Sequence, residues 1–123
     1  MKKLFIASLI LISFGAMANS ACDQPRNDFD GLYCLNKVYQ EADIELNKNY
    51  KTLRPLLDAN GQQALKLGQL AWIRKRNDEC SRKEDNSFFV NLRCATDTTV
   101  ERLRFLQDRI RECKSAGCMN SKL

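Results

Sequence analysis

The chain has 123 residues, with 20 Lys and Arg, 15 Asp and Glu, six Cys and no His. This length suits a single domain. The lack of His excludes Ser-His-Asp and Cys-His nucleophiles, histidine general bases and zinc sites with His ligands. Six Cys in so short a chain predict a disulfide framework in an oxidising compartment.

Residues 1–18 have the three parts of a secretory signal peptide. Lys2 and Lys3 supply the positive charge, an apolar run extends from residue 4 to residue 14, and small residues precede the expected cut after Ala18. The apolar run is too short for a membrane span. An uncleaved anchor is the alternative that we weigh against cleavage.

The mature domain is therefore expected to comprise residues 19–123, in the bacterial periplasm or secreted from the cell. Lipidation of Cys22 is not expected, because Asn19 stands where a lipidation signal has a large aliphatic residue. The mature form should carry no membrane anchor, since no later apolar stretch is long enough to span a bilayer.

Charge is distributed unevenly along the mature chain. Removing residues 1–18 lowers the net charge from +5 to +3. Residues 19–46 hold six acidic and two basic side chains, whereas residues 47–83 hold nine basic and three acidic ones. Such polarity can steer a charged partner. The alternative is that these charges form the solvated faces of helices.

Apolar periodicity predicts two helices in the first part of the mature chain. Apolar side chains recur every three or four residues from Leu32 to Leu57, which indicates an amphipathic helix. Pro55 should end or kink this helix, and residues 58–61 should form a turn. A second helix follows from Ala64 towards Cys80.

The remaining chain predicts a third helix after an irregular connection. Residues 81–87 are polar, residues 88–94 are ambiguous, and no run alternates with the period of a strand. Asp97 can cap the third helix, with Glu101 near the capping-box position. Two long helices joined by a short turn should pack antiparallel. We predict an all-α fold: a small disulfide-stapled three-helix domain built on an antiparallel helical hairpin.

Six Cys allow fifteen connectivities, and spacing alone selects none of them. The expected helices favour three local bonds, Cys22–Cys34, Cys80–Cys94 and Cys113–Cys118. The first ties an N-terminal arm to the first helix, the second closes the irregular connection, and the third spans a helix end at Gly117. Metal binding by thiolates is the alternative. Without a CxxC pair and in an oxidising compartment, we expect neither a metal nor a cofactor.

Each predicted helix carries a charged residue on its apolar stripe, namely Asp43, Arg76 and Arg102. An unpaired buried carboxylate costs several kcal/mol. We therefore predict that Asp43 pairs with Arg76 or Arg102, while Asn47 and Gln69 add hydrogen bonds. We interpret this polar network as a structural brace, with an anion pocket as the alternative.

No catalytic residue is expected, and the chain is predicted not to be an enzyme. Asp43 and Glu45 are two residues apart on a helix and do not face each other, so they make no glycosidase pair. Trp72 has the spacing of a core residue rather than that of a platform for sugar stacking.

Several motifs together resemble the LprI-like family of secreted bacterial proteins. They are Cys22 and Cys34, residues 42–50 (ADIELNKNY), residues 69–76 (QLAWIRKR) with Cys80, and Cys94 followed by Thr99, Arg102 and Leu106. The resemblance covers residues 22–106. It implies a small helical periplasmic or secreted domain, and at least one family member is known as a lysozyme inhibitor. It also implies the bonds Cys22–Cys34 and Cys80–Cys94.

From this resemblance we expect a protein that binds lysozyme or another peptidoglycan hydrolase and occludes its sugar cleft with an exposed loop or acidic face. The candidate contacts lie in the acidic segment: Asp23, Asp28, Asp30 and Glu41. Animal-type lysozymes are strongly basic, so this segment would make a local electrostatic contact.

Other classes of function remain as alternatives. The first is a periplasmic or host-directed interaction module without a hydrolase target, and the second is an enzyme that works without His. Export argues against nucleic-acid binding, despite the basic run at residues 74–76.

Overall fold

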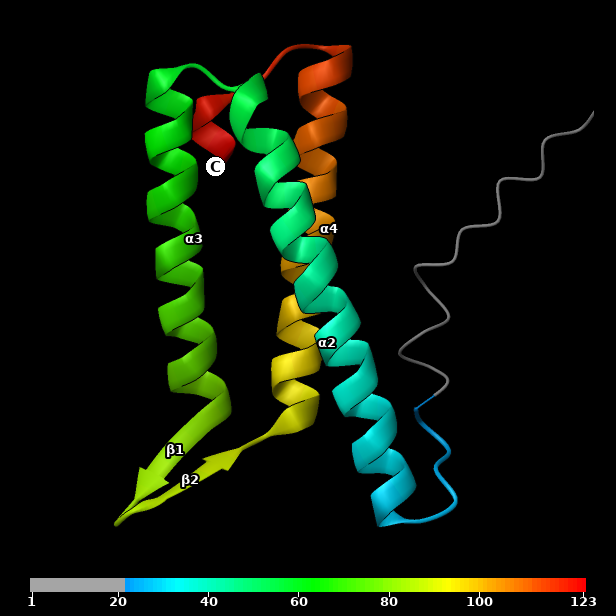
Figure 1. Ribbon diagram of the computed structural model, residues 1–123. Coiled ribbons are helices and arrows are strands. Elements are labelled where there is room, and N and C mark those ends of the chain that lie inside the picture. Colours follow the sequence, from blue (N-terminus) through cyan, green and yellow to red (C-terminus); the bar gives the residue numbers. More distant parts are fainter. Residues whose placement is uncertain (1–21) are drawn as a thin grey trace, which may run out of the picture.

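The computed structural model describes residues 22–123, and the predicted signal peptide with its cleavage position lies outside the described residues. In chain order the elements are α2 (Asp28–Leu53), η1 (Arg54–Leu56), α3 (Ala59–Cys80), β1 (Ser81–Glu84), β2 (Ser87–Val90), α4 (Leu92–Ser115) and η2 (Asn120–Lys122) (Figure 1). Within this part of the chain, none of the helices combines the length and apolar character needed to cross a membrane.

The helices α2 and α4 form the main packing unit of the domain. They run in the same direction, whereas α3 runs antiparallel to both and contacts α4 over a shorter stretch (Figure 1). The predicted helical framework is therefore correct, and consecutive helices are antiparallel as expected. The dominant contact differs from the prediction: α2 packs chiefly on α4 rather than on α3.

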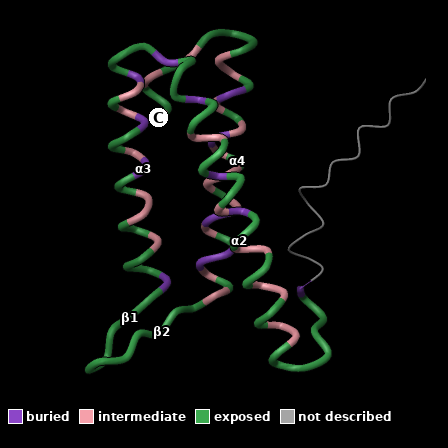
Figure 2. Tube along the Cα trace, viewed as in Figure 1, coloured by how far each residue is buried: buried purple, intermediate pink, exposed green. Residues whose placement is uncertain are grey.

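The core explains this pairing. Its buried members are Leu46, Leu53, Leu57, Leu65, Leu106 and Ile110. Two come from α2 and two from α4, whereas α3 contributes Leu65 alone. Because burial of apolar surface is the main stabilising term, the helices with the richer apolar stripes pack together. Figure 2 shows buried positions along the helices and a fully exposed β1–β2 segment.

The apolar stripe predicted from Leu32 is wrong at its N-terminal end. Leu32 is 57% exposed and Phe29 is 84% exposed. The first turns of α2 extend beyond the start of α4, so no helix covers them (Figure 1). Pro55 acts as predicted, because α2 ends at Leu53 and Pro55 lies within η1.

The start of the third helix was predicted too late. Asn91, not Asp97, is the N-cap of α4, and its side-chain oxygen accepts a hydrogen bond from the backbone N–H of Cys94 at 3.0 Å. Asn satisfies this cap as well as Asp does. Asp97 lies inside the second turn of α4.

The C-terminal segment packs back on the helices. Asn120 donates a hydrogen bond from its side-chain amide to Asp58 at 2.9 Å, and Lys122 pairs with Glu112 at 2.6 Å. The approach is so close that a Cβ at Gly61 would clash with the Asn120 side chain. Glycine at position 61 therefore allows the segment to pack against the start of α3.

Asp58 gives this region a pH dependence that can be measured. Its carboxylate accepts hydrogen bonds from the backbone N–H of Gly61 and the amide of Asn120, and these lower the pKa of Asp58 below its ordinary value. A lowered folded-state pKa contributes stability above the unfolded pKa, and this stability is lost as pH falls through the folded pKa. We expect the Tm of the native protein to fall more steeply between about pH 4 and pH 2 than that of Asp58→Asn. Parallel Tm curves would contradict this.

Candidate partner-binding site

The connection between α3 and α4 is an antiparallel β-hairpin that projects from the helices (Figure 1). The prediction that this connection has no strand is wrong. β1 pairs with β2 in the register Ser81↔Val90, Arg82↔Phe89, Lys83↔Phe88 and Glu84↔Ser87. All eight strand residues are exposed. Asp85 adopts φ 51° at the turn, a left-handed conformation that Asp tolerates better than most residues.

The two faces of the hairpin differ in their free charge. On one face Arg82 lies over the Phe89 ring at 4.8 Å and pairs with Glu84 at 2.7 Å. On the other face Lys83 lies over the Phe88 ring at 5.5 Å. Within residues 22–123, no carboxylate lies within 4.0 Å of the Lys83 ammonium, so its charge is not neutralised by an ion pair. The Lys83 face thus presents a cation beside an aromatic ring that is 76% exposed.

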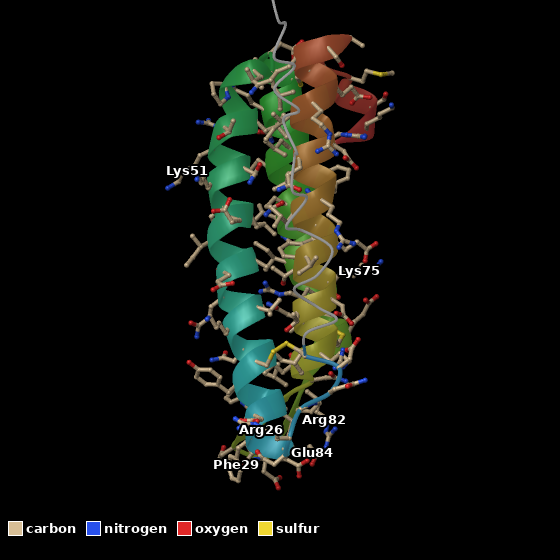
Figure 3. All side chains as sticks on the ribbon, turned by 90° about the vertical axis from the view of Figure 1, so that its right-hand side faces the viewer. Arg26, Phe29, Lys51, Lys75, Arg82 and Glu84 are labelled. Atoms are coloured by element: carbon tan, nitrogen blue, oxygen red, sulfur yellow. A yellow bond between two sulfur atoms is a disulfide. The ribbon has the colours of Figure 1, made fainter. Side chains whose placement is uncertain are left out.

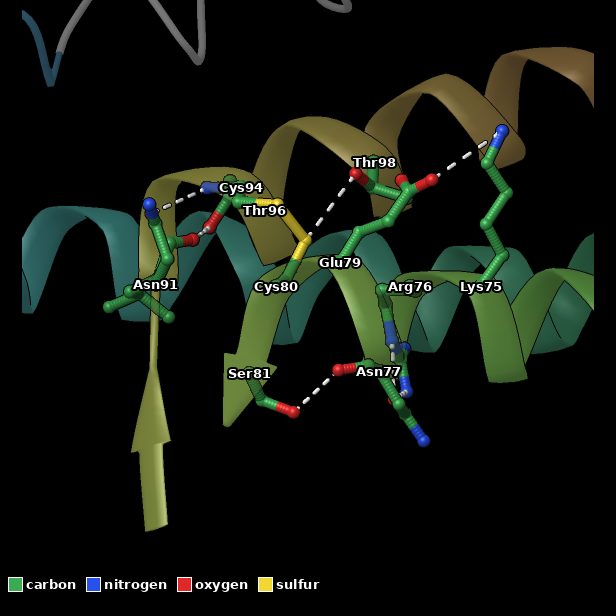
Figure 4. The surroundings of a disulfide bond; sticks show 11 residues. Lys75, Arg76, Asn77, Glu79, Cys80, Ser81, Asn91, Cys94, Thr96 and Thr98 are labelled. Carbon is green, nitrogen blue, oxygen red and sulfur yellow. Dashed lines mark hydrogen bonds and ion pairs between the residues drawn. A yellow bond between two sulfur atoms is a disulfide. The ribbon is translucent and has the colours of Figure 1, made fainter. Parts of the chain in front are cut away.

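The base of the hairpin is fixed to the helices on both sides. The Cys80–Cys94 disulfide joins the end of α3 to the start of α4, with 5.4 Å between the Cα atoms (Figure 4). The backbone N–H of Asn91 donates to the carbonyl of Cys80 at 2.8 Å, and the Ser81 hydroxyl donates to the carbonyl of Asn77 at 2.6 Å. These contacts hold the hairpin at a defined position relative to the helices.

A second exposed apolar group lies at the same end of the molecule. Phe29, Leu32 and Tyr33 of α2 are all exposed and, together with Asn36 and Leu92, line a shallow hollow. Figure 3 places Phe29 of α2 at the same end as Arg82 and Glu84 of the hairpin. We call this end, with the hairpin and the first turns of α2, the distal end.

The four acidic residues predicted as partner contacts do not form one patch. Asp23 pairs with Arg93 at 3.2 Å, and Asp30 pairs with Arg26 at 2.6 Å, so both carboxylates have an internal cation. Asp28 is exposed in the first turn of α2. Glu41 is also exposed but lies about 16 Å along the helix from Asp30. Asp28 and Asp30 therefore belong to the distal end, whereas Asp23 lies in the arm before α2 and Glu41 lies further along the helix.

The predicted polar network is formed only in part. Arg102 donates from Nε to the buried Gln69 side chain at 2.9 Å, which joins α4 to α3. Its guanidinium lies 4.2 Å from the Phe105 ring centroid, and burial lowers the pKa of Arg102. This contact fits the interpretation as a structural brace.

The predicted ion pair of Asp43 is not formed. Neither guanidinium lies within 4.0 Å of its carboxylate in the described part of the chain. Arg76 instead donates to Asn77 and stacks on Trp72 at 5.0 Å, and Asn47 donates to the backbone carbonyl of Asp43. Asp43 is half-buried rather than buried, so water can solvate its charge and no partner is needed.

A link that the sequence did not predict joins α4 to α2. The hydroxyl of Thr96, a fully buried residue, donates to the carbonyls of Leu92 at 2.7 Å and Leu35 at 3.3 Å.

Trp72 is half-buried against the core, in agreement with the predicted core role. The hairpin did have a sequence signal: Asp85-Asn86 is a turn dipeptide, and an apolar Phe-Phe-Val run follows it.

All six Cys form the three predicted disulfides, Cys22–Cys34, Cys80–Cys94 and Cys113–Cys118. The first fixes the N-terminal arm to α2, and the third fixes the C-terminal segment to the end of α4. No thiol remains to bind a metal ion.

Comparison with known protein families gives a match between residues 19–106 and the model of the lysozyme inhibitor LprI family. No curated protein and no solved structure gives a significant match to the chain. The matched residues include α2, α3, the hairpin and most of α4. The chain therefore belongs to the lysozyme inhibitor LprI family.

Proposed function

We propose that this protein is an exported binding protein that inhibits lysozyme, or another cell-wall hydrolase, by blocking its sugar cleft. The observation that carries the proposal is the match of the LprI lysozyme inhibitor family to residues 19–106. Three disulfides agree with an oxidising location, periplasmic or extracellular. The proposed mature domain comprises residues 19–123, released by cleavage after Ala18.

The geometry suits a binding role. Phe29, Tyr33 and Phe88 are each more than 70% exposed and add nothing to the core. Aromatic side chains are enriched where proteins bind one another. Phe29 and Tyr33 line the same hollow, and exposed apolar groups gathered in this way are typical of interaction sites.

The first test is a lysis assay with oxidised residues 19–123 and a c-type lysozyme acting on peptidoglycan. We expect stoichiometric loss of lytic activity. If the protein does not inhibit at a large molar excess, the lysozyme proposal fails for this class. The alternative is then an interaction module without a hydrolase target, and partner capture from periplasm would follow.

The acidic contacts are tested by neutralisation. We propose that Asp28 and Glu41, both exposed, attract a basic lysozyme. The variant Asp28→Asn/Glu41→Gln should weaken inhibition by about two- to thirtyfold at low ionic strength, as expected for two exposed ion pairs. The effect should shrink at about 150 mM salt because of screening.

The matched control is Asp108→Asn/Glu101→Gln, which removes the same charge from exposed positions on α4. It should leave inhibition within about twofold of the native protein, because single rim charges away from an interface contribute little. Equal losses in the two variants would show that only net charge matters, and would remove Asp28 and Glu41 as contacts.

A further inference from the structure

The β1–β2 hairpin carries exposed apolar residues that a connection between two helices does not require. A connection between α3 and α4 could be short and polar, yet it carries three consecutive apolar residues, Phe88, Phe89 and Val90, all exposed. None of the three belongs to the core or packs against it. Apolar surface that stays exposed to water adds no burial free energy to folding, so core packing does not account for these three residues.

The shape of the hairpin suits insertion into a narrow site. Two paired strands are only about 5 Å apart, and every strand residue is exposed. The hairpin points away from the helices (Figure 1), so a partner can approach both faces. The Cys80–Cys94 disulfide and the Asn91–Cys80 backbone hydrogen bond fix its base. A preorganised element loses less conformational entropy on binding.

The hairpin has two basic and two acidic side chains, but its Lys83 face offers a cation to the cleft of a glycoside hydrolase. Such enzymes cleave with a pair of carboxyl groups that flank the scissile bond. The Lys83 ammonium has no carboxylate within 4.0 Å in residues 22–123, whereas Arg82 is neutralised by Glu84. Lys83 is thus the cation at the tip that can pair with a carboxylate of a partner. The exposed Phe88 ring beside it supplies apolar contact area.

We infer that the hairpin, residues 81–90, is the segment that enters the sugar cleft of a lysozyme-type hydrolase, with Lys83 directed at the catalytic carboxylates and Phe88 against the cleft wall. This inference rests on the proposed function. It assigns the occlusion of the cleft to the aromatic hairpin with Lys83, whereas the acidic residues of α2 attract the outer surface of a basic enzyme.

Two single substitutions test this assignment, because each strand residue is exposed and its replacement leaves the core intact. In the lysis assay, Lys83→Glu and Phe88→Ser should each weaken inhibition by about tenfold or more, the loss typical of an interface anchor. Inhibition by the native protein should be competitive with a short N-acetylglucosamine oligomer. Circular dichroism and Tm should match those of the native protein.

The matched control is Lys51→Glu, which makes the same change of charge at an exposed position away from the distal end (Figure 3). It lowers the net charge, so it should leave inhibition of a basic lysozyme unchanged or make it stronger. A loss of inhibition in Lys83→Glu without a loss in Lys51→Glu would therefore identify a local contact. A general electrostatic effect would instead move both variants in the same direction.

Three outcomes separate the two proposals. Inhibition by the native protein with loss in Lys83→Glu and Phe88→Ser supports the hairpin as the blocking segment. Inhibition that survives both substitutions overturns the hairpin assignment and leaves the inhibitor function in place. If the native protein fails to inhibit, both proposals fail for lysozyme. Hydrogen exchange on the native complex gives an independent readout: the amides of residues 81–90 should gain protection, and unchanged exchange there overturns the assignment.

Discussion

Replacing Leu106 by Ala is expected to lower the free energy of unfolding by about 2–5 kcal/mol. Leu106 is 0% exposed and belongs to the core cluster where α4 packs on α2. Removing its branched methyl groups loses transfer free energy and leaves a cavity that the long helices cannot close fully. Small domains have a total stability of about 5–15 kcal/mol, so this single change removes a large share of it.

The measurement is urea denaturation followed by circular dichroism, with Leu67→Ala as the matched control. Leu67→Ala removes the same atoms from α3, but the Leu67 side chain is 57% exposed. The control should stay within about 0.5 kcal/mol of the native protein, as surface substitutions usually do. A loss in Leu106→Ala no larger than that of the control would contradict the assignment of the α2–α4 contact as the core.

Replacing both Cys80 and Cys94 by Ala is expected to cost about 3 kcal/mol, the second large effect. The bond closes a loop with a sequence separation of 14, and the loss of loop entropy in the unfolded chain rises with loop length. The Cys113–Cys118 bond has a separation of 5, so its double replacement should cost less, about 2 kcal/mol. Denaturation of both variants compares the two costs directly.

Loss of the Cys80–Cys94 bond should also act locally. The hairpin would keep its backbone hydrogen bond from Asn91 to Cys80 but lose the covalent tie at its base. We expect faster hydrogen exchange at residues 81–90 and, on the proposed function, weaker inhibition. The Cys113–Cys118 variant should leave exchange in the hairpin unchanged, because that bond lies at the opposite end of α4. Equal exchange in both variants would show that the disulfide does not order the hairpin.

Local rules predicted the helices well and their partners poorly. Periodicity indicated the first two helices, but the turn predicted at residues 58–61 is wrong, because Asp58 caps α3 and the helix begins at Ala59. Pro55 ended α2 because proline has no N–H for the helix ladder. The same periodicity did not indicate which two helices would pack their apolar stripes against each other. The preference of α2 for α4 depends on how many apolar side chains each helix offers, and on Thr96, whose hydroxyl reaches the carbonyl of Leu35 in another helix.

The start of α4 and the hairpin were mispredicted for different physical reasons. Asp97 is a suitable N-cap by residue type, but Asn91 is suitable as well, and it directly follows the end of β2 at Val90. The hairpin was missed because all of its strand residues are exposed, and period-2 alternation arises only where one face is buried. Its turn dipeptide was present, but its strands have only four residues each.

The candidate site could be predicted only in part. The acidic candidates were chosen by charge in a linear segment, but a helix separates residues along its axis and around its surface. Arg93 and Arg26 also pair with two of them, contacts that depend on the fold of the arm. Only the structure showed that residues 81–90 form an exposed hairpin at the distal end.

By itself, the sequence determined the helical class and the resemblance to a secreted family, because these depend on residue type and short-range spacing. The predicted helices then favoured the three local disulfides. Only the tertiary structure decided that α2 pairs with α4, that Asp43 has no ion pair within residues 22–123, and that an exposed hairpin with two Phe rings projects at the distal end. These features depend on contacts between residues far apart in the chain and on what each contact leaves exposed to water, and local patterns do not encode either.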